Sequence, residues 1–170
     1  MMSTLVRFGR LLSLVLWVGG IAFFAFVVAP VAFGRLPTAR EAGLVVGGTL
    51  RILHLLGLVC GLVFLALTVV GVRSRLHRRV FLTECALAVA MVAVTGYSQI
   101  VVLPAMEIYR IGAGGDVNGA DPADPARIHF ERLHRLSERM EGGVLLGGLA
   151  LLFAVASEGG TVRAFETVES

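Results

Sequence analysis

The sequence predicts an all-α integral membrane protein, folded as a four-helix bundle. Of its 170 residues, 56% are hydrophobic and only 16% are charged, and the mean hydropathy is +0.85. A soluble domain of this size could not cover so much apolar surface, so lipid is its natural solvent. The apolar residues also fall into four long runs. The length favours one membrane domain over residues 1–170.

The first apolar run covers residues 11–33. About 23 residues are enough to cross the ~30 Å hydrocarbon core of a bilayer. A positive flank with Arg7 and Arg10 is also typical of a signal peptide. The run is longer than the apolar part of most signal peptides, which favours an uncleaved first span. Pro30 is expected to kink or end this helix.

The second run covers residues 44–72 and carries two helix signals. Thr38 and Glu41 have the spacing of a capping box, which predicts a helix start near Ala39. Gly57 and Gly61 form a GxxxG pair, which permits close approach of another helix. This glycine face therefore predicts helix packing, either inside the chain or in a homo-oligomer.

The third run covers residues 80–105 and is expected to end at Pro104. Glu84, Thr95, Ser98 and Gln99 fall on one side of it at helical spacing. That side is expected to face protein rather than lipid. Glu84 is expected to form a local ion pair with Arg78 and Arg79, with a proton-relay role as the alternative.

A segment rich in Gly, Asp and Pro, residues 111–125, leads to the fourth span. Asp124 is the predicted N-cap and Pro125 the first helical residue. An amphipathic helix over residues 125–141 runs into the span at residues 142–157. That span is short, so turns of the charged part must supply the missing length. Gly143 and Gly147 are again four residues apart and predict helix packing.

The distribution of positive charge predicts the orientation. Four spans place both termini on one side, and short segments with more arginine remain inside. We therefore expect both termini in the cytoplasm, the segment 106–141 outside, and a location in a bacterial inner (plasma) membrane. The arginines predicted to lie inside are Arg7, Arg10, Arg73, Arg75, Arg78, Arg79 and Arg163.

Chain reversal should bring polar residues of three helices together in the outer half of the bundle. A charge at mid-membrane costs about 2.5–3.5 kcal/mol on insertion scales, so such residues usually face a partner or a cavity. Glu131, His134, Glu138 and Glu141 share one arc of a helix. The candidate polar cluster is Arg51, His54, Gln99, His134, Ser137, Glu138 and Glu141.

Two interpretations of this cluster remain open. In the structural one, Arg51 pairs with Glu138 or Glu141 and fixes the fourth helix to the second. In the functional one, His54, His134 and Glu138 bind a metal ion or haem, since His and carboxylate groups at helical spacing hold metals. Glu131 and His134 have the ExxH spacing of di-iron bundles, but the sequence has one copy and such sites need two.

Other function classes find little support in the sequence. No basic run is interleaved with aromatic residues, which disfavours nucleic acid as a partner. Cys60 and Cys85 lie inside apolar runs and indicate reduced packing residues rather than a disulfide. The chain has no Walker motif, nucleophile elbow or CxxC pair. We expect no enzymatic activity and no cofactor, with the lipid bilayer and a homo-oligomer or larger membrane complex as partners.

Several short motifs occur in the order of a known family. They are Trp17-Val-Gly-Gly, the segment from Phe33 to Pro37, Pro104-x-Met106, and Phe130-x-x-Leu-His134-x-x-Ser137. With them the chain resembles the transmembrane-protein-205-like family. The resemblance implies a four-span membrane protein without an established activity; a eukaryotic member is linked to drug resistance and suspected of export or trafficking roles. The matching positions that look functional are Arg35, His134 and Ser137.

A second similarity concerns the entry of the fourth span. His134-Arg135-Leu136-Ser137 is similar to the His-Arg-x-Ser element of succinate dehydrogenase membrane anchors, which lies near quinone and haem. Glu138 stands where those anchors usually have Gly, which argues against quinone binding. The expected function is thus a non-enzymatic binding, transport or accessory membrane protein. The alternative is a metal- or haem-handling, or quinone-contacting, protein that uses His54 and His134.

Overall fold

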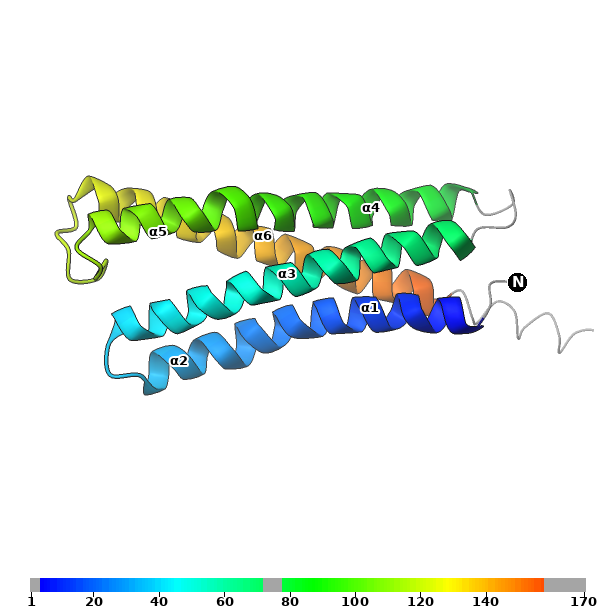
Figure 1. The fold of residues 1–170 in the computed structure, drawn as a ribbon, viewed down its shortest axis with the longest axis horizontal. Helices are drawn as coiled ribbons and strands as arrows, with labels where there is room; N and C mark the ends of the chain where they lie inside the picture. The colour runs from blue at the N-terminus through cyan, green and yellow to red at the C-terminus, as the bar shows by residue number, and fades with distance from the viewer. Residues whose placement is uncertain (1–3, 72–77, 158–170) are drawn as a thin grey trace, which may run out of the picture.

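The computed structural model describes residues 4–71 and 78–157, which form four long antiparallel helical rods (Figure 1). All four are long and apolar enough to cross a membrane, and the described part contains no strand. This confirms the predicted all-α architecture with four membrane spans. The elements are α1 Thr4–Phe23, η1 Phe24–Val28, α2 Ala29–Arg35, α3 Ala39–Gly71, α4 Arg78–Tyr97, η3 Ser98–Val102, α5 Leu103–Gly112 and α6 Pro125–Ser157.

The bundle has two ends, which we name by their connections. At the terminal end α1 and α4 begin while α3 and α6 end; at the loop end are the turn at residues 36–38 and the loop at residues 113–124 (Figure 1). Arg7 Nη2 donates a hydrogen bond to the Ala156 carbonyl at 2.8 Å, which joins the start of α1 to the end of α6. The predicted inner residues Arg73, Arg75 and Arg163, and the predicted span end at Val72, lie outside the described residues.

Both long helices that contain a proline continue through it. Proline lacks an N–H group, and its ring clashes with the carbonyl four residues earlier. A π-helical turn precedes each proline, η1 before Pro30 and η3 before Pro104. Such a turn inserts an extra residue into the helix and relieves the clash. The helix therefore does not stop at Pro104 as predicted but reaches Gly112, and Pro30 does not end the first helix.

Two predicted helix starts are confirmed by their caps. The Glu41 N–H donates to Thr38 Oγ1 at 3.2 Å where α3 begins. The Ala126 N–H donates to Asp124 Oδ1 at 2.7 Å where α6 begins. From that cap α6 runs without interruption to Ser157, so the charged amphipathic segment and the fourth span are one helix.

The GxxxG pair of α3 packs inside the chain, against the indole of Trp17 on α1. A Cβ on Gly57 would overlap Trp17 Nε1, and one on Gly61 would lie 2.7 Å from Trp17 Cζ3. Trp17 is only 1% exposed as a result. This glycine face is thus already occupied and is not open to a second copy of the chain.

The glycines of α6 are used differently from the prediction. A Cβ on Gly143 would meet nothing within 4 Å, whereas one on Gly147 would lie 3.3 Å from Met91 Sδ. The closest approach belongs to Gly148, where a Cβ would overlap Val18 Cγ2. The α1–α6 contact therefore depends on Gly148 rather than on the predicted Gly143.

A buried ion pair joins α1 to α4 near the terminal end. Arg10 Nη2 lies 2.6 Å from Glu84 Oε2, and the two side chains are 3% and 5% exposed. The Arg10 guanidinium carbon also lies 5.2 Å from the centre of the Phe64 ring. The expected partners of Glu84, Arg78 and Arg79, have side chains outside the described part. Arg10 was predicted only as part of a positively charged flank, and not as a buried ion-pair partner.

Candidate functional site: a pocket at the loop end

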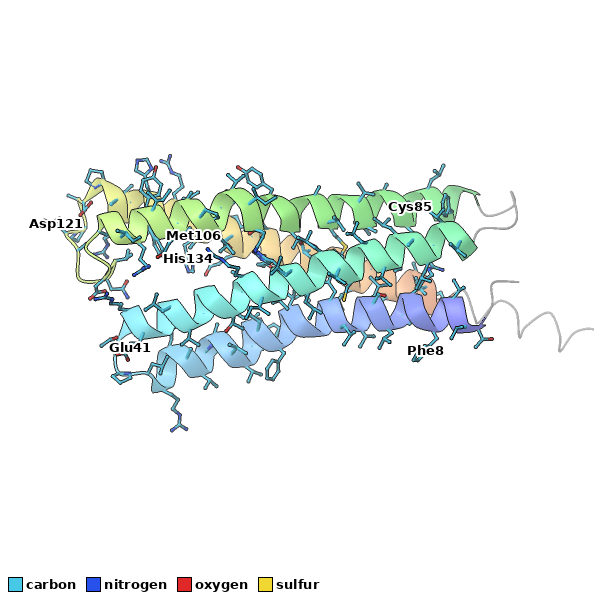
Figure 2. The ribbon with its side chains drawn as sticks, viewed as in Figure 1. Phe8, Glu41, Cys85, Met106, Asp121 and His134 are labelled. Carbon is cyan, nitrogen blue, oxygen red and sulfur yellow. The ribbon has the colours of Figure 1, made fainter. Side chains whose placement is uncertain are left out.

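A cavity of about 710 Å³ lies at the loop end of the bundle. Its walls come from α1–η1–α2, the first half of α3, α5, the 113–124 loop and the first half of α6. Met106 and His134, which both line it, lie in the loop-end half of the bundle in Figure 2. We refer to this cavity as the loop-end pocket.

One wall of the loop-end pocket is apolar. The first helical rod, formed by α1, η1 and α2, contributes Ile21, Phe24 and Phe33 to this wall, and α3 contributes Leu50. The facing part of α3 carries glycines at residues 43 and 47, where an added Cβ would meet nothing within 4 Å. The width of the pocket thus depends on side chains that are missing from one face of α3. This wall was not predicted, although the glycines at residues 43 and 47 repeat the GxxxG spacing.

The opposite wall is polar and comes from α6. It gathers the residues that the sequence placed on one helical arc, because a straight helix keeps such residues on the same side. Ser137 is buried, Glu141 is half-buried, and His134 and Glu138 are exposed. The α6 members of this wall are Glu131, His134, Ser137, Glu138 and Glu141.

The floor of this polar wall is held by a contact between α3 and α6. His54 Nε2 lies 2.5 Å from Glu141 Oε1, and His54 is 1% exposed. The expected partner of the α6 carboxylates, Arg51, is exposed and forms no ion pair within the described residues. The buried stripe of α3 passes through Leu50 and His54, and Arg51 lies at its edge.

The third helical rod, formed by α4, η3 and α5, contributes a buried polar layer near the level of the His54–Glu141 contact. A Cβ on Gly96 of α4 would be 3.9 Å from Leu58 Cδ2 of α3, so these two residues lie at the same level of the bundle. Because α3 and α4 are antiparallel, Ser98 lies within about one turn of the level of His54. The burial of Ser98 confirms the prediction that the polar side of the third span faces protein. The buried atoms without a hydrogen-bond partner in the described part include Thr95 Oγ1, Ser98 Oγ and Gln99 Oε1. Gln99 does not line the loop-end pocket.

The two histidines proposed as metal ligands have different partners. His54 contacts Glu141, whereas His134 Nε2 lies 3.3 Å from Glu138 Oε1 on the same helix. Within residues 4–71 and 78–157, no three His, Cys, Asp or Glu side chains converge as a metal site requires. The predicted set of His54, His134 and Glu138 is therefore not assembled.

Most other charges near the loop-end pocket are neutralised locally. Arg110 makes two hydrogen bonds to the Glu107 carboxylate, at 2.8 and 2.6 Å. Glu131 accepts a hydrogen bond from Arg127 at 3.0 Å and has Arg135 at 3.8 Å. These pairs follow helical spacing and need no contact across the bundle.

A model of the family described as "Domain of unknown function (DUF4149)" matches residues 12–111. This stretch is more than half of the chain. The chain belongs to the DUF4149 family. The DUF4149 match includes His54 and the apolar wall of the pocket but ends before α6, which carries the polar wall. No curated protein and no solved structure matches the chain. The resemblance to the transmembrane-protein-205-like family stays a prediction.

Proposed function

We propose that this DUF4149 protein is a non-enzymatic integral membrane protein that binds an amphipathic molecule in the loop-end pocket, in order to hold it or pass it on. The supporting observation is an apolar wall that faces a charged wall at the same depth. The α1–α6 contact between Val18 and Gly148 fixes this depth. Seven residues towards the loop end on each antiparallel helix, Ala25 (18 + 7) lies opposite Glu141 (148 − 7).

A ligand with both characters would satisfy both walls. The first helical rod is apolar up to Phe33, whereas α6 is apolar only from Gly142 onward. The carboxylates of α6 therefore lie at a depth where the facing helical rod carries only apolar side chains. Burying charged groups without a partner is costly, and binding sites are typically apolar with a few convergent polar groups. The volume of about 710 Å³ is within the usual range for a small-molecule site.

We further propose that the loop end faces the outside of a bacterial inner membrane. Arg7 and the buried Arg10 lie near the terminal end, and the positive-inside rule places such short arginine-bearing flanks in the cytoplasm. The loop-end pocket then lies at the outer boundary of the bilayer, where an amphipathic molecule has its own polar group.

Binding of a ligand to the pocket can be followed by the fluorescence of Trp17, the only tryptophan of the chain. Trp17 lies one helical turn from Ile21 of the apolar wall, and bromine atoms quench tryptophan fluorescence at short range. Single-chain amphipaths with a brominated tail are titrated into nanodiscs of neutral lipid that contain the protein. Saturable quenching of Trp17 is expected.

Gly47→Leu and Gly48→Leu form a matched pair of variants. Neither position has an atom within 4 Å of an added Cβ, but only Gly47 lines the loop-end pocket. We expect saturable quenching to disappear in Gly47→Leu and to persist in Gly48→Leu. Equal quenching in both variants, or no saturable quenching by any amphipath in the unsubstituted protein, would refute the proposed function.

A further inference from the structure

We infer, on the basis of the function proposed above, that the loop-end pocket selects amphipathic molecules with a cationic amine head, which Glu138 and Glu141 bind. An ammonium group is the complement of two carboxylates that lie one helical turn apart. The apolar tail of the same molecule contacts the wall formed by α1, η1 and α2.

The carboxylates of the α6 wall differ in how they are neutralised. Glu131 is neutralised by Arg127, but neither Glu138 nor Glu141 has an arginine partner within the described residues. Their contacts are with the imidazole rings of His54 and His134. These two carboxylates therefore carry most of the negative charge that the pocket leaves without a counter-ion.

The positive charges that line the loop-end pocket lie beside the 113–124 loop. Arg40 and Arg110 line the pocket, and both lie against Gly115 of the loop: an added Cβ there would be 3.4 Å from Arg40 Cζ, and Arg110 Nη1 donates to its carbonyl at 3.2 Å. Arg40 lies 14 residues (54 − 40) before His54, which is about 21 Å along α3. The arginines thus lie at the mouth, beside the 113–124 loop, whereas Glu141 lies deeper, at the level of His54.

The surroundings of Glu141 favour a simple amine as the head group of the ligand. A cation bound to one oxygen of Glu141 leaves the other in its 2.5 Å contact with His54. Arg40 and His54 are about 21 Å apart along α3, so a head group held at Glu141, beside His54, lies well away from the level of Arg40. Phe24, next to Ala25 at the level of Glu141, offers an aromatic face, which attracts ammonium groups. A simple lipophilic amine therefore fits better than a zwitterionic lipid.

The experiment uses three probes with the same brominated tail and a primary amine, a hydroxyl or a carboxylate as the head. Binding is measured by quenching of Trp17 in nanodiscs of neutral lipid, and Gly47→Leu supplies the background. The amine probe is expected to bind at least about tenfold more tightly than the hydroxyl probe, since charge-assisted hydrogen bonds contribute that much.

Charge-neutral variants identify the carboxylates that cause this preference. The double variant Glu138→Gln, Glu141→Gln is expected to lose the preference for the amine while it binds the hydroxyl probe as before, which shows that the pocket is intact. Glu41→Gln is the control, because Glu41 is an exposed carboxylate that does not line the loop-end pocket. It is expected to keep the preference.

The possible failures are distinguishable. If all three probes bind equally, or if the carboxylate probe binds best, the pocket exists but the amine inference is wrong. A preference that survives in the double variant also overturns it. If no probe gives saturable quenching that depends on Gly47, the proposed function fails together with the inference.

Discussion

At the residue scale, the most strongly buried charges are Arg10 and Glu84. Removing two ions from water costs several kcal/mol each, and good geometry must offset this cost. The 2.6 Å contact of Arg10 with Glu84 and its position over the Phe64 ring supply that geometry. The pair connects the first and third helical rods at the terminal end, so it fixes their relative position where the apolar core ends.

We expect Arg10→Met and Glu84→Met each to lower the stability by about 3–5 kcal/mol, because either change removes the 2.6 Å ion pair from a buried charge. The double variant Arg10→Met, Glu84→Met should lose less than the sum of the single changes. Unfolding in mixed detergent micelles gives the four stabilities of this double-mutant cycle. Additive single effects would show that the two side chains are not coupled.

The sequence predicts which residues are polar and inward, but not how they pair. The same helical arc of α3 offered both Arg51 and His54 to the carboxylates of α6. Which of them points inward depends on a rotation of α3 by about 60°, and that rotation is set by the fit of Gly57 and Gly61 against Trp17. The His54–Glu141 contact was therefore not accessible without the packed structure.

At the element scale, glycine spacing marks close contacts but does not identify their partners. Gly57 and Gly61 accommodate an indole, whereas the glycines at residues 43 and 47 leave a cavity, although both pairs have the same spacing on one helix. A GxxxG pair alone therefore does not indicate an oligomer. The difference arises because only the first pair faces a large side chain.

Gly57→Ala is expected to destabilise the protein by about 1–3 kcal/mol, because the new methyl group overlaps the rigid indole of Trp17. Gly48→Ala is the matched control on the same helix. It adds a methyl group in open space and should be neutral or stabilising by up to about 1 kcal/mol. Unfolding midpoints of the two variants in detergent provide the comparison.

A second substitution tests the cause of this destabilisation. If the overlap with Trp17 is responsible, Gly57→Ala should cost less in a Trp17→Leu background. An unchanged cost in that background would mean that Gly57 is required for another reason.

The helix bounds show where prediction from sequence fails at this scale. The starts of α3 and α6 were predicted, because a capping side chain acts on the next few residues only. The end of the third helix was not, because η3 allows the chain to pass Pro104. A π-helical turn has no sequence pattern of its own, so a proline in an apolar run leaves both outcomes open.

At the scale of the whole molecule, the helices are longer than a bilayer requires. Each of α3 and α6 has 33 residues, about 50 Å, against ~30 Å of hydrocarbon. The charged residues of α6 are confined to its loop-end half, so this half projects beyond the apolar layer. In the proposed arrangement the loop end contacts water or lipid head groups, and the mouth of the loop-end pocket lies at the membrane surface.

The orientation of this projecting end is testable by labelling with a membrane-impermeant maleimide. Ala123 lies exposed in the loop at residues 113–124, and Thr4 is exposed at the terminal end. We expect Ala123→Cys to react in intact spheroplasts, and Thr4→Cys only after permeabilisation, because the orientation proposed above places the arginine-bearing terminal end inside. The background is low because Cys60 is buried and Cys85 half-buried. The reverse pattern would place the pocket mouth on the cytoplasmic side, where it would take its ligand from the inner leaflet instead.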